Sequence, residues 1–197
     1  MADGAATTTA TDAGIDGTWT VDTETGDFDY ESATGSFVGF RISEELSTIG
    51  STTAVGRTGD IDGSMLIEGT TVTETSIDID LTTITTETSR RDDNVQDGLD
   101  TGEFPTATFT LVDPIELGEG AADGEPVSVT AVGELTLHGV TQPVEFAMDA
   151  QLVDGTVVAV GTTTISFDDY DIDLPDGGPV ISVDDEATLE LQLLLTR

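Results

Sequence analysis

The sequence predicts an all-β protein, an antiparallel sandwich or barrel of about eight to ten strands. Three observations lead to this prediction. Apolar and polar residues alternate along most of the chain from Gly17 onward, turn signals rich in Gly and Asp separate the alternating runs, and only two segments break the rhythm. One β domain with a single core accounts for a chain of 197 residues. We therefore expect a single domain over residues 17–197.

The expected strands follow from the alternation. A strand over residues 70–83 is the clearest, because the odd-numbered residues from Thr75 to Leu81 form one mainly apolar face. Further strands are expected from Trp19 to Val21, over residues 37–42, 60–68, 106–112, 127–137, 143–148 and 187–196, and as a pair from Gln151 to Phe167 that turns at Asp154-Gly155.

The stretch from Leu135 to Phe146, LTLHGVTQPVEF, is predicted to contain the turn of a β-hairpin. Gly139 supplies the backbone freedom that a tight connection needs. The parity of the strand places His138, the only histidine, on the outward side at this turn. A hydrogen-bonding role for His138 is therefore favoured over general-base catalysis.

Two segments are expected to differ from strands. Ser43 to Gly50, SEELSTIG, is predicted to form a helical turn behind a serine cap. Glu87 to Leu99, ETSRRDDNVQDGL, is polar and charged and is predicted to be helical or irregular.

The chain is strongly acidic. It has 40 acidic residues against 5 basic ones, a formal charge of −35, and each basic residue is Arg. This balance argues against nucleic acid as a partner, because phosphates would be repelled rather than neutralised, and it disfavours an anionic membrane surface. Two interpretations of the acidity stay open. The carboxylates either keep a β protein soluble, or adapt it to high salt, which screens their mutual repulsion.

Residues 1–16, which begin MADGAATTTATDAG, are small, polar and without period, and we expect a disordered tail or linker. They lack the charged and apolar regions of a secretory signal. No run in the chain approaches the roughly 20 apolar residues of a membrane-spanning helix. Such a tail would also be left if a membrane anchor had been trimmed away.

The sequence offers little support for a catalytic or metal site. Cysteine is absent, and no G-x-S-x-G, HExxH or Walker sequence occurs. Asp169, Asp171 and Asp173 have the spacing of a calcium loop, but Leu174 stands where that loop needs Gly. A solvated acidic loop is favoured over a weak cation site. We expect no catalytic residue, no metal ligand and no cofactor.

The inward side chains of a closed barrel either fill its lumen or leave room for one apolar ligand. Here the inward set mixes bulky residues with small ones such as Ala131, Gly133 and Gly161. Small residues leave room, but the same mixture also lets a filled core interdigitate. From the residues alone, both outcomes stay open.

A series of short motifs carries a family resemblance. They are WTVD at 19–22, SFVGF at 36–40, Arg91-Asp92, FPTATF at 104–109 and, most specifically, GELTLHGVTQPV at 133–144. In this order they resemble the YceI family, and the resemblance runs from about Gly17 to Arg197. It implies a lipocalin-like antiparallel β-barrel of about eight strands with a short helical insertion.

The resemblance also implies a function. Relatives of this type hold a polyisoprenoid or a similar long-chain amphiphile in an apolar lumen and are exported to the periplasm or cell exterior. Residues 166–174 are acidic where relatives often carry a basic residue, which favours a neutral, quinone-like lipid over a phosphorylated one. We therefore expect a non-enzymatic barrel that binds or transports a long-chain lipid. The expected lining is Phe40, Ala107, Phe109, Leu111, Leu135, Leu137, Val144, Phe146, Met148, Phe167 and Tyr170.

Three alternatives remain. A salt-adapted structural or interaction domain would have a filled core and no ligand. An enzyme built on His138 would direct the imidazole into a cleft. A cation-dependent module would be destabilised by chelation.

Overall fold

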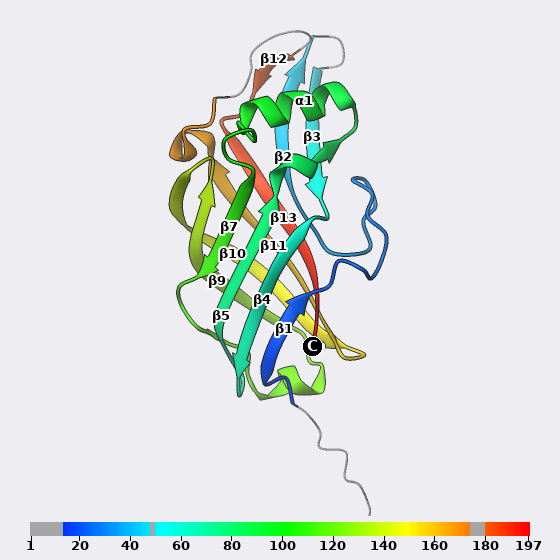
Figure 1. Cartoon of the computed structure of the whole chain (residues 1–197), viewed down its shortest axis with the longest axis vertical. Helices are drawn as coiled ribbons and strands as arrows, with labels where there is room; N and C mark the ends of the chain where they lie inside the picture. The colour runs from blue at the N-terminus through cyan, green and yellow to red at the C-terminus, as the bar shows by residue number, and fades with distance from the viewer. Residues whose placement is uncertain (1–13, 48–49, 174–179) are drawn as a thin grey trace, which may run out of the picture.

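The computed structural model describes residues 14–47, 50–173 and 180–197. Within them, eight antiparallel strands close an elongated barrel, because the last of them, β13, pairs with the first, β1 (Figure 1). In order around the barrel these strands are β1 (Gly17–Val21), β4 (Ile61–Glu68), β5 (Thr71–Asp80), β7 (Thr106–Leu111), β9 (Val127–Leu137), β10 (Val140–Val153), β11 (Thr156–Ser166) and β13 (Glu186–Thr196). The predicted barrel is confirmed.

Beyond the end of β1, a β-hairpin extends the wall of the barrel. It consists of β2 (Phe37–Leu46) and β3 (Gly50–Thr58). β13 pairs with β1 near its C-terminal end and with β2 over residues 188–192, so β2 takes over the edge that β1 leaves. Three short strands complete the sheet: β6 (Thr85–Thr86) beside β3, β8 (Ile115–Glu116) beside β5, and β12 (Val180–Val183) beside β2.

Helical segments lie at the two ends of the barrel. The helix α1 (Ser89–Gly98) crosses the upper end, and the 3-10 turn η2 (Glu119–Asp123) lies at the lower end (Figure 1). The side chain of Thr88 accepts a hydrogen bond from the backbone N–H of Arg91 and so caps α1. Two further 3-10 turns are η1 (Leu81–Thr83) and η3 (Phe167–Tyr170). The predicted helical character of residues 87–99 is confirmed.

The helical turn predicted for Ser43 to Gly50 is wrong. Residues 43–46 continue β2, and Gly50 begins β3, a strand that the alternation did not reveal. The cause is Glu44, which occupies an inward position of β2 between Ile42 and Leu46 and is buried. A carboxylate at an inward position breaks the apolar rhythm, so the strand looked as if it ended at Ile42.

The packed part of the chain begins before Gly17, where the tail was expected to end. Ile15 is only 3% exposed, and its carbonyl accepts a hydrogen bond of 2.8 Å from the indole N–H of Trp19. The carboxylate of Asp16 accepts from the backbone N–H of Gly69. Ile15 is the one large apolar residue after Met1 in the predicted tail, and burying it holds this segment on the barrel. The rest of the predicted tail, residues 1–13, lies outside the described residues.

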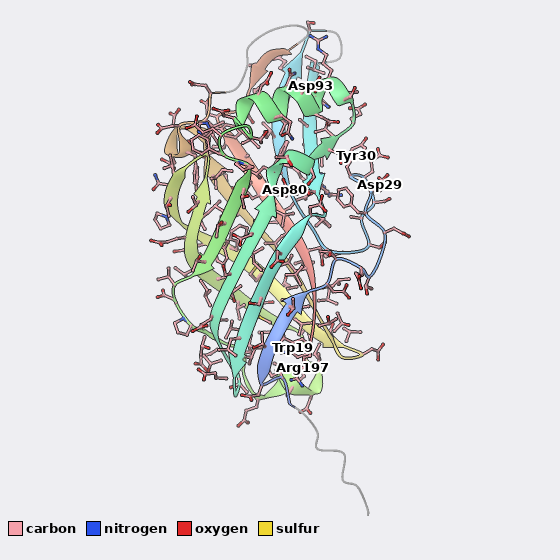
Figure 2. All side chains as sticks on the ribbon, in the orientation of Figure 1. Trp19, Asp29, Tyr30, Asp80, Asp93 and Arg197 are labelled. Atoms are coloured by element: carbon pink, nitrogen blue, oxygen red, sulfur yellow. The ribbon has the colours of Figure 1, made fainter. Side chains whose placement is uncertain are left out.

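Arg197 contacts Trp19 at the junction of β1 and β13. Its guanidinium lies 4.6 Å above the indole ring and donates hydrogen bonds to the backbone carbonyls of Gly14 and Asp16. Figure 2 shows the two side chains together where β1 and β13 meet. The first and last strands are thus joined by side chains as well as by their ladder.

Candidate ligand-binding cavity

A cavity of about 450 Å³ lies inside the barrel. Its lining comes from seven of the eight barrel strands and from β2, β3 and α1, and most of the lining side chains are apolar. On β9 the lining extends from Val127 to Leu137, about 34 Å along the strand and about 26 Å along the axis of a barrel with ordinary strand tilt. The cavity is therefore a narrow tunnel, and the lumen is open rather than filled.

Most of the predicted lining residues border this cavity. The nine that do are Phe40, Ala107, Phe109, Leu111, Leu135, Leu137, Phe146, Met148 and Phe167. Their contact with a ligand stays a prediction.

Val144 and Tyr170 are buried but are not part of the cavity lining. Val144 has the same inward parity on β10 as Phe146 and Met148, but it packs within the buried core. Tyr170 ends the 3-10 turn η3, where the period of two that holds along β11 no longer determines the direction of a side chain. The contact of these two residues with a ligand stays a prediction, and their place outside the cavity lining does not support it.

The sequence reasoning also missed lining residues at both ends of the tunnel. Ile15 and Ala121 border it at the lower end, and Glu44 and Val95 border it near α1. Glu44 could have been found, because it continues the inward series of Phe40 and Ile42 with period two. Ile15 and Ala121 lie in irregular segments, where no periodicity reports on direction.

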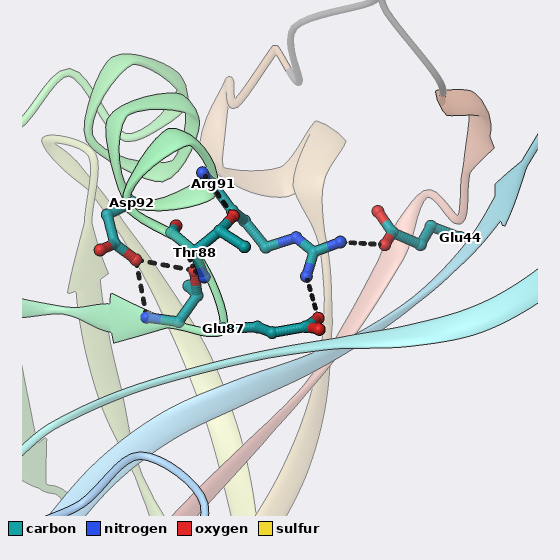
Figure 3. Close-up of polar contacts among 6 residues, drawn as sticks. Glu44, Glu87, Thr88, Arg91 and Asp92 are labelled. Atoms are coloured by element: carbon teal, nitrogen blue, oxygen red, sulfur yellow. Dashed lines mark hydrogen bonds and ion pairs between the residues drawn. The ribbon is translucent and has the colours of Figure 1, made fainter.

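A cluster of charged residues borders the end of the cavity beneath α1. The Arg91 guanidinium lies 2.5 Å from a carboxylate oxygen of Glu44 and 3.3 Å from one of Glu87 (Figure 3). Asp92 accepts hydrogen bonds of 2.7 Å from both the N–H and the hydroxyl of Thr86. These contacts tie α1 to β2 and to β6 over the open end of the tunnel.

The charges at this end balance. Glu44 and Glu87 supply two negative charges, and Arg90 and Arg91 supply two positive charges. Arg90 and Asn94 are exposed and still border the cavity, so the tunnel reaches the surface here. At the lower end the exposed lining residues are Glu125 and Gln151. Among the described residues, guanidinium groups line the cavity only at the α1 end.

Glu190 also borders the cavity, but its carboxylate is bound by arginines of the β2–β3 hairpin. One oxygen lies 2.7 Å from Arg41 and the other lies 2.6 Å from Arg57. Arg57 is buried, lies 4.4 Å above the ring of Phe37 and donates to the carbonyl of Tyr30. This network fixes the outer face of the hairpin and leaves no free charge for a ligand at Glu190.

His138 has the hydrogen-bonding role that its parity predicted. It forms a two-residue turn with Gly139, and both residues have positive φ, as the type I′ hairpin turn requires. Its Nδ1 lies 3.0 Å from the carbonyl oxygen of Tyr170, and its ring packs against the edge of Phe104 at 5.0 Å. Because a carbonyl only accepts, Nδ1 carries the proton. His138 holds η3 against the hairpin and does not border the cavity.

Tyr170 is 1% exposed, and its hydroxyl has no hydrogen-bond partner among the described residues. Burial raises the pKa of the Tyr170 phenol to about 12, and the carboxylate of Asp169 adds to the effect. The phenol is therefore neutral at any physiological pH.

The acidic loop after β11 is described only as far as Asp173. Within residues 14–47, 50–173 and 180–197, no group of three or more His, Asp or Glu side chains is arranged to hold a metal ion. Leu174 of the candidate calcium loop lies outside the described residues. In the same part of the chain, no helix combines the length and apolar character that crossing a bilayer requires.

Comparisons with known proteins agree with this architecture. A UPF0312 protein of Pseudomonas paraeruginosa is 31% identical over 173 residues, which cover 82% of this chain and 79% of the relative. A polyisoprenoid binding domain from Saccharophagus degradans superposes with a TM-score of 0.70 at 21% identity, over 90% of this chain and 97% of that one. Burkholderia cenocepacia BcnA superposes with a TM-score of 0.61 at 18% identity, over 85% and 99%.

The family model of the YceI-like domain matches residues 7–195, nearly the whole chain. The resemblance drawn from the hairpin motif and its supporting motifs is confirmed. This acidic barrel belongs to the YceI-like domain family.

Proposed function

We propose that this protein binds a long-chain apolar ligand, a polyisoprenoid or quinone-like lipid, in the lumen of its barrel, and that it stores or carries the ligand without chemically changing it. The observation that carries the proposal is the continuous apolar tunnel of about 450 Å³, a volume within the usual range of small-molecule sites. The polyisoprenoid binding domain from Saccharophagus degradans, which shares this fold, supports the choice of ligand class.

The shape of the tunnel favours a chain over a compact ligand. A lining of about 26 Å along the axis suits an extended hydrocarbon, whereas a compact ring system would leave most of that length empty. Each buried methylene contributes about 0.8 kcal/mol, so a chain of some 15 to 20 carbons gains well over 10 kcal/mol before the cost of immobilising it. Binding therefore needs few polar contacts.

The polar end of the ligand lies beneath α1 in this proposal. The two carboxylates and two guanidinium groups there cancel, and Arg91 is already bonded to Glu44 and Glu87. Because the charges at this end sum to zero, a phosphate would gain no net attraction, whereas a neutral carbonyl or hydroxyl can accept a hydrogen bond from Arg90 or Asn94. A neutral head group is therefore favoured.

We place the protein outside the cytoplasm, in the periplasm or at the cell exterior, on the family resemblance alone. A lipid carrier with an anionic surface and without a basic patch would meet membranes through its ligand rather than through charge. The high-salt interpretation of the acidity is compatible with this location.

Native mass spectrometry, followed by organic extraction, tests the proposal. We expect the purified protein to carry a co-purifying lipid, and the lipid-free protein to gain thermal stability when an isoprenoid quinone is added. A protein that carries no lipid and whose melting temperature does not change with added quinone would not be a lipid carrier. That result would favour the structural or interaction domain.

A further inference from the structure

We propose that glycines facing the lumen set its bore, that is, the width of the tunnel. Each glycine lets a bulky side chain of the neighbouring strand lie flat against the wall. The tunnel thereby admits a methyl-branched chain and not only a straight one. The inference deepens the proposed function and rests on it for the nature of the ligand. The glycine pairs themselves are features of the wall that can be tested without any ligand.

Gly161 and Met148 are the first such pair. They face each other in register across β11 and β10, and Met148 borders the cavity. A Cβ atom added at Gly161 would overlap the sulfur atom of Met148. The thioether therefore lies in the space that a side chain at Gly161 would occupy. With any larger residue there, Met148 would have to swing inward.

Gly56 and Phe40 are the second pair, in register across β3 and β2. A Cβ atom at Gly56 would lie 2.6 Å from two atoms of the Phe40 ring and 3.2 Å from a methyl carbon of Ile84. The ring is laid over the glycine instead of projecting across the lumen. Phe40 and Ile84 both border the cavity, so this pair also shapes its wall.

Gly133 and Phe109 form a third pair, between β9 and β7. A Cβ atom at Gly133 would lie 2.5 Å from the edge of the Phe109 ring. Phe109 in turn packs edge to face against Phe146, with ring centroids 5.6 Å apart. The glycine thus sets the position of an aromatic pair that borders the tunnel.

The three pairs lie on three different strand pairs and widen the lumen from several sides. Protein interiors are closely packed, so adding or removing one methyl group in the wall changes how well a ligand fits the lumen. A prenyl chain is wider than a straight alkyl chain by its methyl branches. We infer that recessing Met148, Phe40 and Phe109 over glycines provides this extra width.

Gly161→Ala is the cleanest test of the bore. Gly161 does not have a positive φ, and the nearest backbone atom to an added Cβ is the carbonyl oxygen of Ala147 at 3.3 Å, so alanine fits once Met148 moves. Gly133 is less suitable, because a Cβ there would also collide with the backbone carbonyl of Thr110. Gly102→Ala is the matched control: Gly102 is exposed, and its added Cβ would meet nothing closer than 3.9 Å.

The probes are 3,7,11,15-tetramethylhexadecan-1-ol and hexadecan-1-ol, which share a saturated main chain of the same length and the hydroxyl and differ only in methyl branches. We expect Gly161→Ala to weaken binding of the branched alcohol at least tenfold and binding of hexadecanol much less. The double variant Gly161→Ala/Met148→Ala should restore binding of the branched alcohol, because the displaced side chain is gone. Gly102→Ala should change neither affinity.

A second readout is independent of any ligand. Carbon-13 labelling of the methionine methyl groups gives Met148 its own NMR signal, and in Gly161→Ala this methyl should gain contacts with side chains across the lumen. An unmoved Met148, or an unchanged ratio of the two affinities in a protein that binds both probes, would overturn the inference. If the unmodified protein binds neither probe, the proposed function fails, and the signal of Met148 alone decides whether the glycines set the bore.

Discussion

The guanidinium of Arg91, at the start of α1, lies 2.5 Å from the carboxylate of Glu44, which points inward from β2 and is 8% exposed. This ion pair joins α1 to the barrel wall at one end of the tunnel, the end that the guanidinium groups border. No residue of α1 is fully buried, although Val95 and the C-cap residue Leu99 pack on the core. Polar contacts such as Arg91 with Glu44 therefore carry much of the attachment of this helix.

We expect Arg91→Gln to lower the free energy of unfolding by about 2 kcal/mol, because it leaves a buried carboxylate without its partner. Urea denaturation measures the change. Glu87→Gln is the matched control: its carboxylate is 70% exposed and lies 3.3 Å from Arg91, so its loss should cost no more than about 0.5 kcal/mol. The double variant Arg91→Gln/Glu44→Gln should regain part of the loss. If it is no more stable than Arg91→Gln, the uncompensated carboxylate is not the cause.

Tyr170→Phe should leave the stability unchanged or raise it by about 1 kcal/mol, since the buried hydroxyl has no partner among the described residues. The pH dependence gives a sharper test. The folded phenol has a pKa of about 12 against 10 when unfolded, so the unfolded state loses its proton first as pH rises. The free energy of unfolding should therefore fall between pH 10 and 12, by at most about 1.4 kcal/mol per unit.

Tyr170→Phe should remove most of that slope, as measured by urea denaturation at several alkaline pH values. Desolvation and neighbouring carboxylates also raise the pKa of Tyr30, so Tyr30→Phe serves as the comparison. If the fall in the free energy of unfolding with pH persists in Tyr170→Phe and disappears in Tyr30→Phe, its source is Tyr30 and the prediction for Tyr170 is wrong.

Arg197→Ala should loosen the junction of the first and last strands. The substitution removes the cation–π contact with Trp19 and the hydrogen bonds to the carbonyls of Gly14 and Asp16. We expect a loss of about 1 to 2 kcal/mol and a shift of Trp19 fluorescence to longer wavelength, because Trp19 is the only tryptophan and is now 2% exposed. Arg197→Lys, which keeps the charge above the ring, should lose less. Identical spectra of all three proteins would show that Arg197 does not hold the first and last strands together.

The sequence predicted the wall of the barrel well, and the physical reason is periodicity. Along β9 and β10 each second residue faces inward, so Leu135, Phe146 and Met148 could be assigned to the lumen from the sequence alone. The same rule gives no guidance where the backbone leaves the extended conformation. Tyr170 follows β11 by a single 3-10 turn and is buried without bordering the cavity.

The ends of the tunnel could not be predicted, because they depend on contacts between segments far apart in sequence. Glu44 and Arg91 are 47 residues apart, and Trp19 and Arg197 meet only because β1 pairs with β13. The recess of Met148 over Gly161 likewise depends on the register of β10 and β11. Alternation identifies both residues as inward but does not show that they face each other.

The acidic surface makes a prediction about salt. Asp62 and Asp78 face each other across β4 and β5 and are both exposed, and with a formal charge of −35 few neighbouring cations offset such pairs. Like charges that face each other across strands are destabilising, and the Debye length falls from about 10 Å at 0.1 M salt to about 3 Å at 1 M. We therefore expect the stability to rise between about 0.1 and 2 M sodium chloride. A flat curve would contradict adaptation to high salt.

Asp62→Asn separates charge screening from any general effect of salt on the core. It should raise the free energy of unfolding by about 0.5 kcal/mol at 0.1 M sodium chloride, and this gain should shrink towards zero at 2 M because the repulsion it removes is then already screened. Asp113→Asn, at an exposed position outside any strand pair, is the control and should gain less. Chloride is preferable to sulfate, which strengthens apolar burial in any protein. If the gain from Asp62→Asn is the same at both salt concentrations, facing carboxylates do not make the barrel depend on salt.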